Sequence, residues 1–550
     1  MKKDTKYILI LIVLSYLFFM FGNGIISLTD PDEVFYTLTA KEMVQKNSWM
    51  TPYMFGQPQF EKPILLYWLM RAGFLVFGIN PFSARFFPAF FALLGVIAVY
   101  LLARIFFKSE KKAFLSSLVL LSGGLYVGLA RTVFTDMIFT VLILLALLCF
   151  YWGYSDPRRK TAGVILFFAS MGLAVLAKGP LGFVIPFLTA LVFLLIRKEG
   201  RFLLCRASLW GMGLCLLICL PWYLLMIKKY GSLFTREFFY NDHIRRFFEA
   251  EHITNDTWYF YPASMIGCIF PWSLFLAAGL FYLFRGLKRT KGPELFLACW
   301  IAVTFLTFQP AHSKLTSYIL PLFPALAIVA GNFLYEAAAR QEKRLLFSRL
   351  ALATLLSLVL IPVGLLVASM IFKEYIPSAL PVYFLIALFV VWIVLLFRAL
   401  INYRPFRFIY LLALMVPIFL SVIPFIKDQI EPYLSSKQAC EYLISEQPIG
   451  QGTIAASKPF LRGVRYYTGN EMAFFNTYAK NFFSPHPIIF LDTDEKAESF
   501  FRSQGINFCV IKKNAVEDLE RIARDRGFEI NLLKKVGLEY IYRVEPLKKK

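Results

Sequence analysis

The chain has 550 residues, of which 58% are hydrophobic and only 17% are charged. Soluble globular domains are nearer half apolar and a quarter charged, so this composition excludes an ordinary soluble protein and indicates a chain with the lipid bilayer as its solvent. The net charge of +23 would suit nucleic acid, but the basic residues gather in short connections between apolar runs. That distribution is typical of cytoplasmic loops and argues against nucleic-acid binding.

A bilayer core of about 30 Å is crossed by about 20 apolar residues, and about 13 such runs can be marked along the chain. They begin near Tyr7, Ser83, Ala113, Val133, Thr161, Leu181, Ala207, Ala263, Leu295, Leu315, Leu350, Leu380 and Phe408. Every second connection is rich in Lys and Arg, at 2–6, 104–112, 158–160, 197–206, 285–291, 340–349 and 398–407. Because basic residues accumulate in cytoplasmic loops, the alternation predicts a polytopic α-helical inner-membrane protein with a cytoplasmic N-terminus and an extracytoplasmic C-terminal segment.

The same alternation places two long connections, 29–82 and 228–262, on the outer side. The polar segment 427–550 follows the last run and mixes short β-rich stretches with helical ones, which predicts a soluble periplasmic α/β domain. Strands are expected at 453–456, 488–491, 508–511 and 540–544, and helices at 435–444, 494–503 and 515–527. The transmembrane domain is then expected to cover residues 1–426.

The eight Cys residues form no CxxC pair, and most of them lie inside apolar runs, where they act as small hydrophobic residues. Cys440 and Cys509 lie in the polar segment instead. A disulfide between these two is an open alternative if the segment faces an oxidising compartment.

The apolar runs carry no ionisable side chain near their middle. Ion-coupled transporters place carboxylates or broken helices at the bilayer midplane, so the pattern argues against that class. Polar and charged side chains gather instead where the runs emerge on the outer side: Asp32, Glu33, Glu61, Lys62, Arg131, Asp136, Lys178, His243, Arg245, Arg246, His312, Lys314 and Tyr318. The chemistry is therefore expected at the outer interface.

The first outer segment opens with Asp30, Pro31, Asp32 and Glu33, followed by a helical pattern, and two interpretations are open. In the structural one, Asp30 caps the helix, Pro31 occupies its first turn, and the acidic residues favour its positive end. In the functional one, Asp32 acts as a general base or orients an acceptor hydroxyl. Partial removal from water raises the pKa of a carboxyl, which suits it to accept a proton.

Further along this segment, Glu61 and Lys62 are adjacent, and neighbouring residues on a helix point in different directions. Two separate roles are therefore expected rather than one salt bridge. Lys62 can bind a lipid-linked phosphate through charge-assisted hydrogen bonds. The alternative for Lys62 is a surface lysine whose stem covers apolar surface.

Several short motifs occur in a fixed order along the chain. They are Asp32-Glu33-x-x-Tyr36, Trp49-Met50-Thr51-Pro52, Glu61-Lys62-Pro63, Tyr67-Trp68, Ala84-Arg85, Arg131-Thr132-Val133-Phe134-Thr135-Asp136, Ala177-Lys178-Gly179-Pro180, Asn241-Asp242-His243-Ile244-Arg245-Arg246 and Ser313-Lys314-Leu315-Thr316-Ser317-Tyr318. In this order they resemble the GT-C glycosyltransferases of the protein-mannosyltransferase and aminoarabinose-transferase superfamily, with the closest match to the aminoarabinose-transferase branch. The resemblance covers most of residues 1–330.

The resemblance implies the GT-C fold and a polyprenyl-phosphate-sugar donor, from which the sugar passes to an acceptor, usually with inversion and with no nucleotide cofactor. By similarity, Asp32 is the essential loop aspartate and Asp136 the second acidic position near the donor. Lys62 and Tyr318 match the contacts to the donor phosphate. Further substrate or anion contacts are expected from Glu33, Arg131, Lys178, Arg246 and Lys314.

Glu61 and His243 match a pair that binds a zinc ion in aminoarabinose transferases. One carboxylate and one imidazole are a small ligand set, so water, substrate or further ligands would have to complete it. The alternative for His243 is a hydrogen-bonding residue of the outer loop.

The expected function is transfer of a sugar from a polyprenyl-phosphate carrier to a lipid or glycan acceptor, such as lipid A, on the outer face of the inner membrane. A lipid A phosphate is already an anion, so Asp32 would position it, whereas a hydroxyl acceptor would need Asp32 as a base. A protein O-glycosyltransferase and a flippase or transporter of polyprenyl lipids are the alternatives.

Overall fold

The computed structural model describes residues 2–249, 255–287, 292–371, 380–446, 452–475, 488–504 and 507–547. The chain divides into two compact units. The first comprises Met1–Asn23, Phe60–Leu66 and Arg85–Pro424, and the second comprises Gly24–Gln59, Tyr67–Ala84 and Phe425–Lys550.

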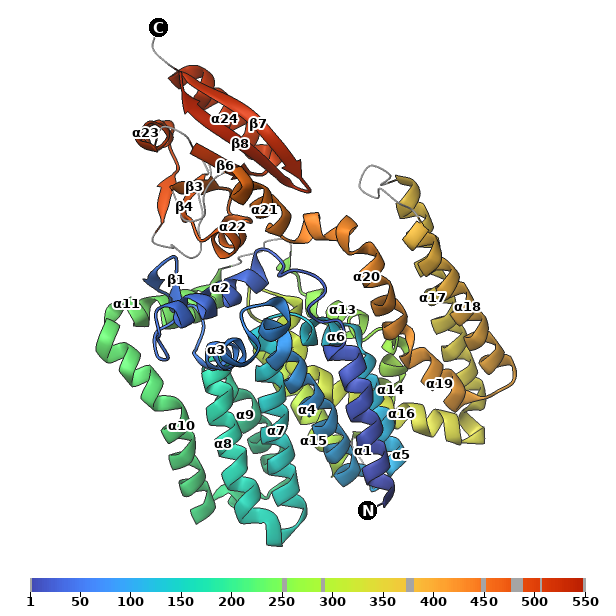
Figure 1. Cartoon of the computed structure of the whole chain (residues 1–550). Helices are drawn as coiled ribbons and strands as arrows, with labels where there is room; N and C mark the ends of the chain where they lie inside the picture. Colours follow the sequence, from blue (N-terminus) through green and yellow to red (C-terminus); the bar gives the residue numbers. More distant parts are fainter. Residues whose placement is uncertain are drawn as a thin grey trace. The chain divides into compact units, whose positions relative to one another are not determined.

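The first unit is built from helices (Figure 1). Up to the second long outer connection these are α1 (Lys2–Ser15), the π-helix η1 (Tyr16–Met20), α4 (Pro81–Phe107), α5 (Glu110–Ser122), α6 (Gly124–Ala130), α7 (Thr135–Ser155), α8 (Lys160–Lys178), α9 (Leu181–Arg197) and α10 (Arg206–Tyr230). After it come α11 (Ser232–Thr235), the π-helix η4 (Arg236–Arg245), α12 (Arg246–Phe248), α13 (Phe260–Gly267), α14 (Ser273–Gly286), α15 (Pro293–Phe308), the 3-10 helix η7 (Thr316–Leu322), α16 (Phe323–Ala339), α17 (Arg344–Ile371), α18 (Leu380–Ile401), α19 (Pro405–Ala413) and α20 (Met415–Leu434). The part of α20 from Phe425 onward belongs to the second unit.

Eight of the described helices are long and apolar enough to cross a membrane, or nine if the bent pair of α5 and α6 is one span. The axes of this pair meet at 64°, at the Gly123–Gly124 step, and paired small residues are a common cause of such a bend. Other predicted runs form shorter apolar helices, among them α9, α14 and α15. The structure thus confirms a mostly helical multi-pass membrane protein, while the count of about 13 spans stays a prediction.

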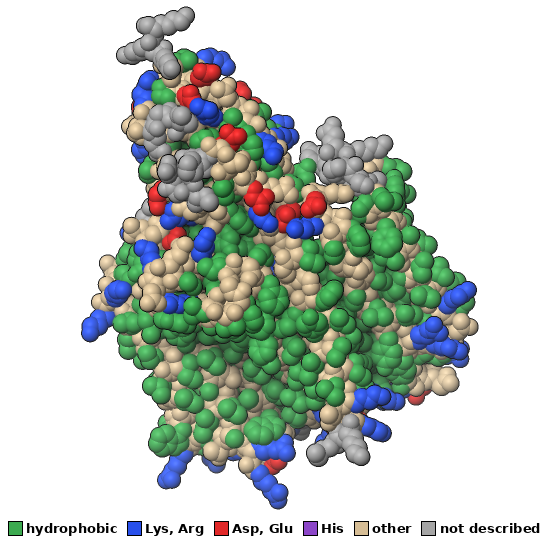
Figure 2. Space-filling model, in the orientation of Figure 1, with side chains coloured by type: hydrophobic (Ala, Val, Ile, Leu, Met, Phe, Trp, Pro, Cys, Tyr) green, Lys and Arg blue, Asp and Glu red, His purple; other side chains and the backbone are tan. Residues whose placement is uncertain are grey.

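Burial separates central helices from peripheral ones in this unit. The apolar stretches of α7 and of η7 with α16 are 72% and 83% buried, whereas those of α17 and α18 are only 28% buried. An apolar helix with so little burial needs lipid around it. Hydrophobic side chains accordingly cover the visible face of these helices (Figure 2).

Small residues allow the central helices to approach closely. Helix α5 packs against α16, and a Cβ added at Gly331 of α16 would lie 2.4 Å from the backbone of Ser116 in α5. Close contacts through small residues are the usual way in which membrane helices associate, because lipid provides no hydrophobic force between them.

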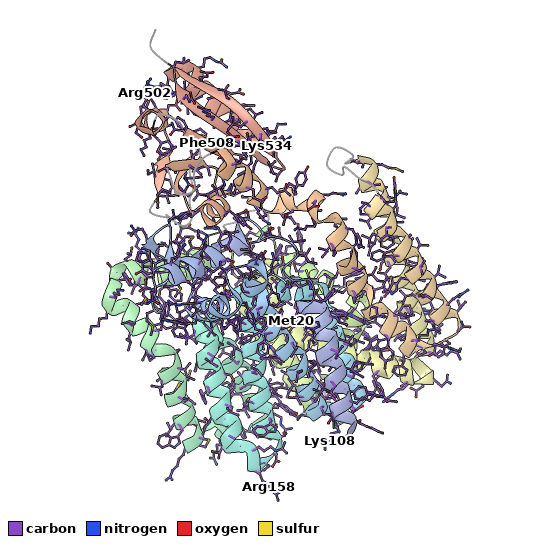
Figure 3. All side chains as sticks on the ribbon, viewed as in Figure 1. Met20, Lys108, Arg158, Arg502, Phe508 and Lys534 are labelled. Atoms are coloured by element: carbon purple, nitrogen blue, oxygen red, sulfur yellow. The ribbon has the colours of Figure 1, made fainter. Side chains whose placement is uncertain are left out.

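Two of the basic connections lie at the same end of the bundle. Lys108 follows α4 and Arg158 follows α7, and Figure 3 shows both at the same end of the helices. This arrangement agrees with the alternation of basic connections from which the topology is predicted.

The second unit contains a six-stranded sheet with the order β5–β4–β3–β6–β8–β7. Its strands are β3 (Thr453–Ala456), β4 (Glu471–Phe475), β5 (Ile489–Leu491), β6 (Asn507–Ile511), β7 (Phe528–Val536) and β8 (Glu539–Pro546). The first four in this order pair in parallel, and β6, β8 and β7 pair antiparallel. Every residue of β6 is buried, as expected for a strand covered on both faces.

Helices cover this sheet and complete the predicted α/β domain. They are α21 (Lys437–Glu446), α22 (Leu461–Thr468), α23 (Asp494–Gln504) and α24 (Val516–Arg526). The core between α23, α24 and the sheet includes Phe501, Leu519, Ile522 and Cys509. Cys440 and Cys509 are both buried and free, so the structure holds no disulfide between them.

The second unit also includes much of the first outer segment, with α2 (Asp32–Gln45), the hairpin of β1 (Tyr53–Met54) and β2 (Gln57–Pro58), and most of α3 (Leu65–Phe77). Segments far apart in the sequence therefore belong to one compact unit. The C-terminal segment of this unit begins at Phe425.

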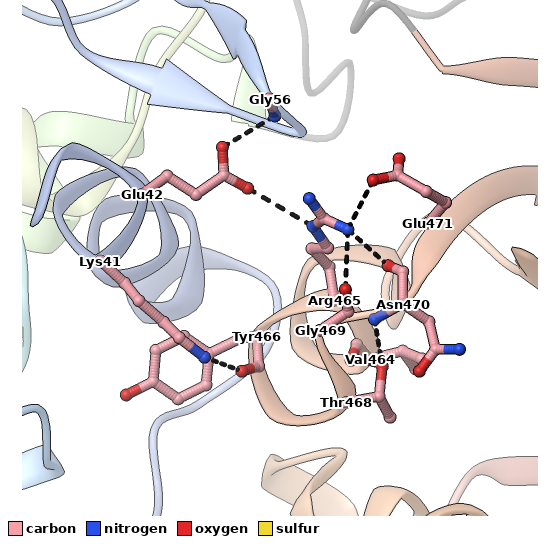
Figure 4. Close-up of polar contacts among 10 residues, drawn as sticks. All are labelled: Lys41, Glu42, Gly56, Val464, Arg465, Tyr466, Thr468, Gly469, Asn470 and Glu471. Atoms are coloured by element: carbon pink, nitrogen blue, oxygen red, sulfur yellow. Dashed lines mark hydrogen bonds and ion pairs between the residues drawn. The ribbon is translucent and has the colours of Figure 1, made fainter. Parts of the chain in front are cut away.

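Arg465 of α22 joins α2 to the sheet region (Figure 4). Its guanidinium donates to Glu42 of α2 at 3.4 Å and to Glu471 at 3.0 Å. The Glu42 carboxylate also accepts a hydrogen bond from the backbone of Gly56 at 2.8 Å. Beside it, the Lys41 ammonium donates to the carbonyl oxygen of Tyr466 at 2.6 Å, so two adjacent residues of α2 bind α22.

The expected capping role of Asp30 is wrong, because the start of α2 has no side-chain cap. The Asp30 carboxylate instead accepts a hydrogen bond at 2.8 Å from the backbone N–H of Ser436. Glu33 holds the start of the helix, since its carboxylate accepts bonds of 2.9 Å from both the backbone N–H and the hydroxyl of Thr29.

Asp30 and Glu539 form a buried acidic pair bridged by Ser436. The Ser436 hydroxyl donates to the Glu539 carboxylate, and Glu539 is only 2% exposed. Burial raises the pKa of Asp30 to about 7, although the hydrogen bonds from Ser436 oppose the shift. Burial also raises the pKa of Glu539 to about 8. Desolvation penalises the charged form of a carboxyl, so both groups are neutral at mildly acidic pH.

Candidate functional site

A cavity of about 200 Å³ in the first unit collects four of the predicted site residues. Those four are Lys62, Lys178, Arg246 and Tyr318, and the other lining residues are Phe139, Leu181, Asp242, Phe247, Thr307, Phe308, Ala311 and Ser313. The wall is thus mostly apolar, with a few charged groups that converge on it. That combination is typical of ligand pockets.

The first charged group in this cavity is a carboxylate held between two cations. The Lys62 ammonium contacts both Asp242 carboxylate oxygens at 2.7 Å, and Arg246 contacts one of them at 2.8 Å. The side chains of Lys62 and Asp242 are 12% and 9% exposed, so these charge-assisted bonds are partly shielded from water and stronger than surface pairs.

The second charged group pairs Asp136 with Lys178. Asp136 lies in the first turn of α7 and Lys178 is the last residue of α8, so each charge has the sign that its helix end favours. The Lys178 ammonium also lies 4.4 Å from the centroid of the Tyr318 ring, which is within the range of a cation–π contact. The two helix ends therefore bring a carboxylate, an ammonium and a phenol ring together.

The π-helix η4 and the short helix α12 supply Asp242 and Arg246. Wider π-turns are uncommon and occur often at functional sites. Backbone hydrogen bonds attach this segment to the chain before η7, from His312 to the Phe247 carbonyl at 3.0 Å and from Ser313 to the Arg246 carbonyl at 3.2 Å. One wall of the cavity is thereby fixed by main-chain contacts.

Asp256 lies beside this wall and binds two predicted site residues. Its carboxylate accepts bonds from His312 at 2.7 Å and from Lys314 at 2.9 Å. The hydrogen bond from His312, followed by that from Lys314, holds the pKa of Asp256 below its usual range. Lys314 is thus engaged next to the cavity and does not line it.

The cavity is suited to an anion attached to an apolar group. It presents the cations of Lys62, Lys178 and Arg246 and the carboxylate of Asp242, with Asp136 paired to one of the cations. A phosphate oxygen forms the same charge-assisted bonds to ammonium and guanidinium groups that the Asp242 carboxylate forms here. Phe139, Phe247 and Phe308 offer apolar contact beside these cations.

Arg131 has a different role from these cations. Its guanidinium donates to the carbonyl oxygens of Phe18 and Phe21 at 3.1 and 3.0 Å, at the end of η1. Such bonds satisfy carbonyl groups that a helix end leaves without partners. Burial lowers the pKa of Arg131 to about 10, so it stays charged at neutral pH.

Asp32 and Glu33 belong to the second unit. Asp32 is the exposed first residue of α2, whereas Glu33 is fully buried and bound to Thr29. Of the structural interpretation, the acidic first turn remains, because Asp32 lies where a negative charge favours the positive end of the helix, whereas Asp30 does not cap it. The catalytic role of Asp32 stays a prediction.

The structure describes the side chain of only one of the two predicted zinc ligands. Glu61 is half-buried in the first unit, whereas the side chain of His243 lies outside the described residues. Within the described part of the chain, no group of three or more His, Cys, Asp or Glu side chains is arranged to hold a metal ion.

Asp242 and Asp256 are the site residues that sequence reasoning missed. Asp242 stands four residues before Arg246, a spacing that places two side chains on one face of a helix, so the pair had a local signal. Asp256 had none, because its partners His312 and Lys314 are more than fifty residues away.

Comparison with known proteins agrees with this architecture. Residues 5–232 match the family described as dolichyl-phosphate-mannose-protein mannosyltransferase. The chain is 32% identical over 322 residues to the undecaprenyl phosphate-alpha-4-amino-4-deoxy-L-arabinose arabinosyl transferase of Edwardsiella ictaluri, covering 58% of this chain and 57% of that protein. An uncharacterised protein of Aquifex aeolicus is 30% identical over 354 residues, covering 64% of this chain and 69% of that protein.

A solved structure matches over almost the whole length. The crystal structure of ArnT from Cupriavidus metallidurans bound to undecaprenyl phosphate superposes with a TM-score of 0.78 at 18% identity, covering 98% of both chains. The chain is thus a multi-pass membrane protein with the GT-C fold. It belongs to the superfamily of protein mannosyltransferases and aminoarabinose transferases. The aligned part spans less than two thirds of the length of the arabinosyl transferase relative.

Proposed function

We propose that this protein is a glycosyltransferase that moves a sugar from a polyprenyl-phosphate carrier to a lipid or glycan acceptor. The observation that carries the proposal is the convergence of Lys62, Arg246 and Lys178 on one apolar-walled cavity. A polyprenyl-phosphate-sugar has a phosphate between an apolar chain and a sugar, so it needs both kinds of contact. The name of the Edwardsiella ictaluri relative, which specifies an undecaprenyl-phosphate-linked aminoarabinose, supports this donor class.

The proposed reaction is a direct displacement at the anomeric carbon. An acceptor oxygen attacks this carbon, the bond to the phosphate oxygen breaks, and the bonding electrons leave with the polyprenyl phosphate. The donor phosphate carries one negative charge and gains another as the bond breaks. Lys62 and Arg246 would stabilise this developing charge, which is the kind of interaction that accelerates a reaction rather than only binding its substrate.

The roles of the acidic residues depend on the acceptor. A hydroxyl acceptor must lose its proton, and Asp32 is the proposed base. A phosphate acceptor, as on lipid A, is already an anion, and Asp32 would then orient it. Asp136 would hold the Lys178 ammonium in place, since the two side chains are paired.

The metal is a separate part of the proposal. Glu61 and His243 would contribute two ligands to a zinc ion, which would supply electrostatic stabilisation when bound. Metal analysis of the purified protein tests the site without reference to activity. We expect one zinc per chain in the wild type and none in Glu61→Gln or His243→Ala, and equal zinc in all three proteins would rule out this ligand pair.

The orientation of the chain is proposed from the basic connections. The N-terminus would lie in the cytoplasm and residues 427–550 in the periplasm, so that the cavity would bind donors at the outer face of the inner membrane. Figure 3 supports this, since Lys108 and Arg158 lie at a common end of the helices.

The decisive experiment supplies purified protein with a radiolabelled polyprenyl-phosphate-sugar and follows both the sugar and the carrier phosphate. We expect release of polyprenyl phosphate together with a labelled acceptor, and mass spectrometry of lipid A, membrane glycans and glycoproteins identifies that acceptor. Lys62→Ala and Arg246→Ala should each reduce transfer by about 10²-fold.

Lys228→Ala is the matched control, because Lys228 is an exposed lysine at the end of α10 and does not line the cavity. Its activity should equal that of the wild type. Donor binding without release of carrier phosphate would indicate a transporter instead, and label on protein alone would indicate a protein O-glycosyltransferase. Full activity of Lys62→Ala would refute the assignment of the cavity.

A further inference from the structure

A second and larger cavity, of about 570 Å³, opens beside the N-terminal helix. It lies where α1, α5 and α19 meet, and both α1 and α19 contact α5. It shares no lining residue with the cavity of Lys62 and Arg246. The proposed glycosyl transfer makes no use of it.

Three lysines stand at one end of this cavity: Lys3, Lys6 and Lys111. All three are exposed, and none forms an ion pair with another of the described residues. They come from two different basic connections, 2–6 and 104–112, that the fold brings together. A positive mouth is therefore built from segments about a hundred residues apart in sequence.

The two acidic residues at this mouth share one further cation. Arg104 binds Asp4 at 3.1 Å and Glu110 at 3.1 Å, and Tyr100 donates a hydrogen bond to Asp4 at 2.7 Å. These bonds also hold the start of α1 against α4. Because one arginine serves two carboxylates, one negative charge remains against the three lysines. The mouth is still net positive, which suits an external anion.

The remainder of the cavity wall is apolar. Ile10 and Leu14 of α1 and Phe18 of the following π-helix η1 contribute, opposite Phe114 and Leu118 of α5. From Lys6 to Leu14 the helix α1 rises by roughly 12 Å at 1.5 Å per residue, and Phe18 of η1 extends the groove further. Half of the hydrocarbon core of a bilayer is about 15 Å thick, so this groove has the length of one acyl chain in one leaflet.

We propose that this cavity binds an anionic phospholipid, with the headgroup phosphate on Lys3, Lys6 and Lys111 and one acyl chain along the groove. Charge complementarity selects the occupant, because a zwitterionic headgroup would bring its own cation to a mouth that is already positive. The lipid belongs to the leaflet that the basic connections face. Its contacts with both α1 and α5 tie the N-terminal helix to the bundle.

The test is native mass spectrometry of the full chain, titrated with phosphatidylglycerol or with phosphatidylethanolamine of the same acyl chains. The wild type should retain phosphatidylglycerol preferentially. Lys3→Gln, Lys6→Gln and Lys111→Gln combined should reduce that affinity by about 10- to 100-fold, on the basis of the usual attraction between one basic residue and an anionic lipid, and leave phosphatidylethanolamine unchanged.

A matched control removes the same charge elsewhere. Arg158→Gln, Lys198→Gln and Arg201→Gln combined change three exposed basic residues of other connections that do not line the cavity, and should leave phosphatidylglycerol retention intact. Ile10→Trp fills the groove with all charges kept, and should weaken retention of the lipid. Equal losses in both triple variants, or no preference for phosphatidylglycerol in the wild type, would overturn the proposal.

Discussion

Raising the pH toward 8 should destabilise the second unit, because the folded unit buries the carboxyl groups of Asp30 and Glu539. Both groups accept a hydrogen bond from Ser436. In the folded protein their pKa values are about 7 and about 8, whereas unfolded Asp and Glu titrate near 4. A carboxyl whose pKa is raised by folding binds more protons in the folded state than in the unfolded state. Its contribution to stability is therefore fully present below pH 4 and is lost as the pH rises toward its folded pKa.

The size of the effect follows from the two shifts. Between about pH 5 and pH 7 both groups are protonated when folded and ionised when unfolded, so each removes up to about 1.4 kcal/mol of stability per pH unit. Together they give an upper limit of about 2.7 kcal/mol per pH unit. For a unit of this size each kcal/mol corresponds to about 2–4 °C in melting temperature, so the change is several degrees per pH unit.

The measurement compares melting temperatures at pH 5.5, 6.5, 7.5 and 8.5 for the wild type and for Asp30→Asn with Glu539→Gln. The amides keep the size and hydrogen-bonding oxygens of the acids but do not titrate in this range. We expect the wild type to lose stability with rising pH much more steeply than the double variant. Parallel curves for the two proteins would refute the assignment of the pH dependence to this pair.

Three further predictions concern the chemistry, the helix packing and the topology. Asp32→Asn should reduce transfer by about 10²-fold or more with donor binding kept. Asp30→Asn should change stability rather than turnover. Equal loss of transfer activity in both variants would move the chemistry to another acid. Gly331→Leu should lower the free energy of unfolding by about 1–3 kcal/mol, whereas Gly364→Leu, at a position with open space, should be neutral in the same thermal scan. A reporter active only in the cytoplasm, fused after Lys550, should be silent, and an active fusion would show that the span count is wrong by one.

The sequence predicted most of the C-terminal strands, because each of them is a short apolar run between turn signals. The strand expected at 453–456 is β3, and that expected at 508–511 is β6 with one more residue. Among the described elements of this domain, the sequence missed β4, β7 and α22. Strand β7 lies at the edge of the sheet and carries several charged residues, and α22 is a helix of eight residues with Gly463 inside it. Periodicity is weak in elements of this kind.

Long-range partners account for the other differences. Asp30 has the sequence context of a helix cap, but its partner Ser436 lies 406 residues away, and no local pattern reports that contact. The candidate site shows the same limit. Lys62, Asp136 and Lys178 could be named from their motifs, whereas their pairing with Asp242 or with one another is a product of the fold.

The binding of Arg465 to both Glu42 and Glu471 has a consequence for protein engineering. A chimera that replaced the segment after Pro424 with that of a relative would also remove the partners of α2, the helix that begins with Asp32. Loss of activity in such a hybrid would then report a misplaced outer loop rather than a change of substrate preference. An exchange of Gly24–Gln59 and Tyr67–Ala84 together with the C-terminal segment would keep the contacts of Arg465 within one compact unit.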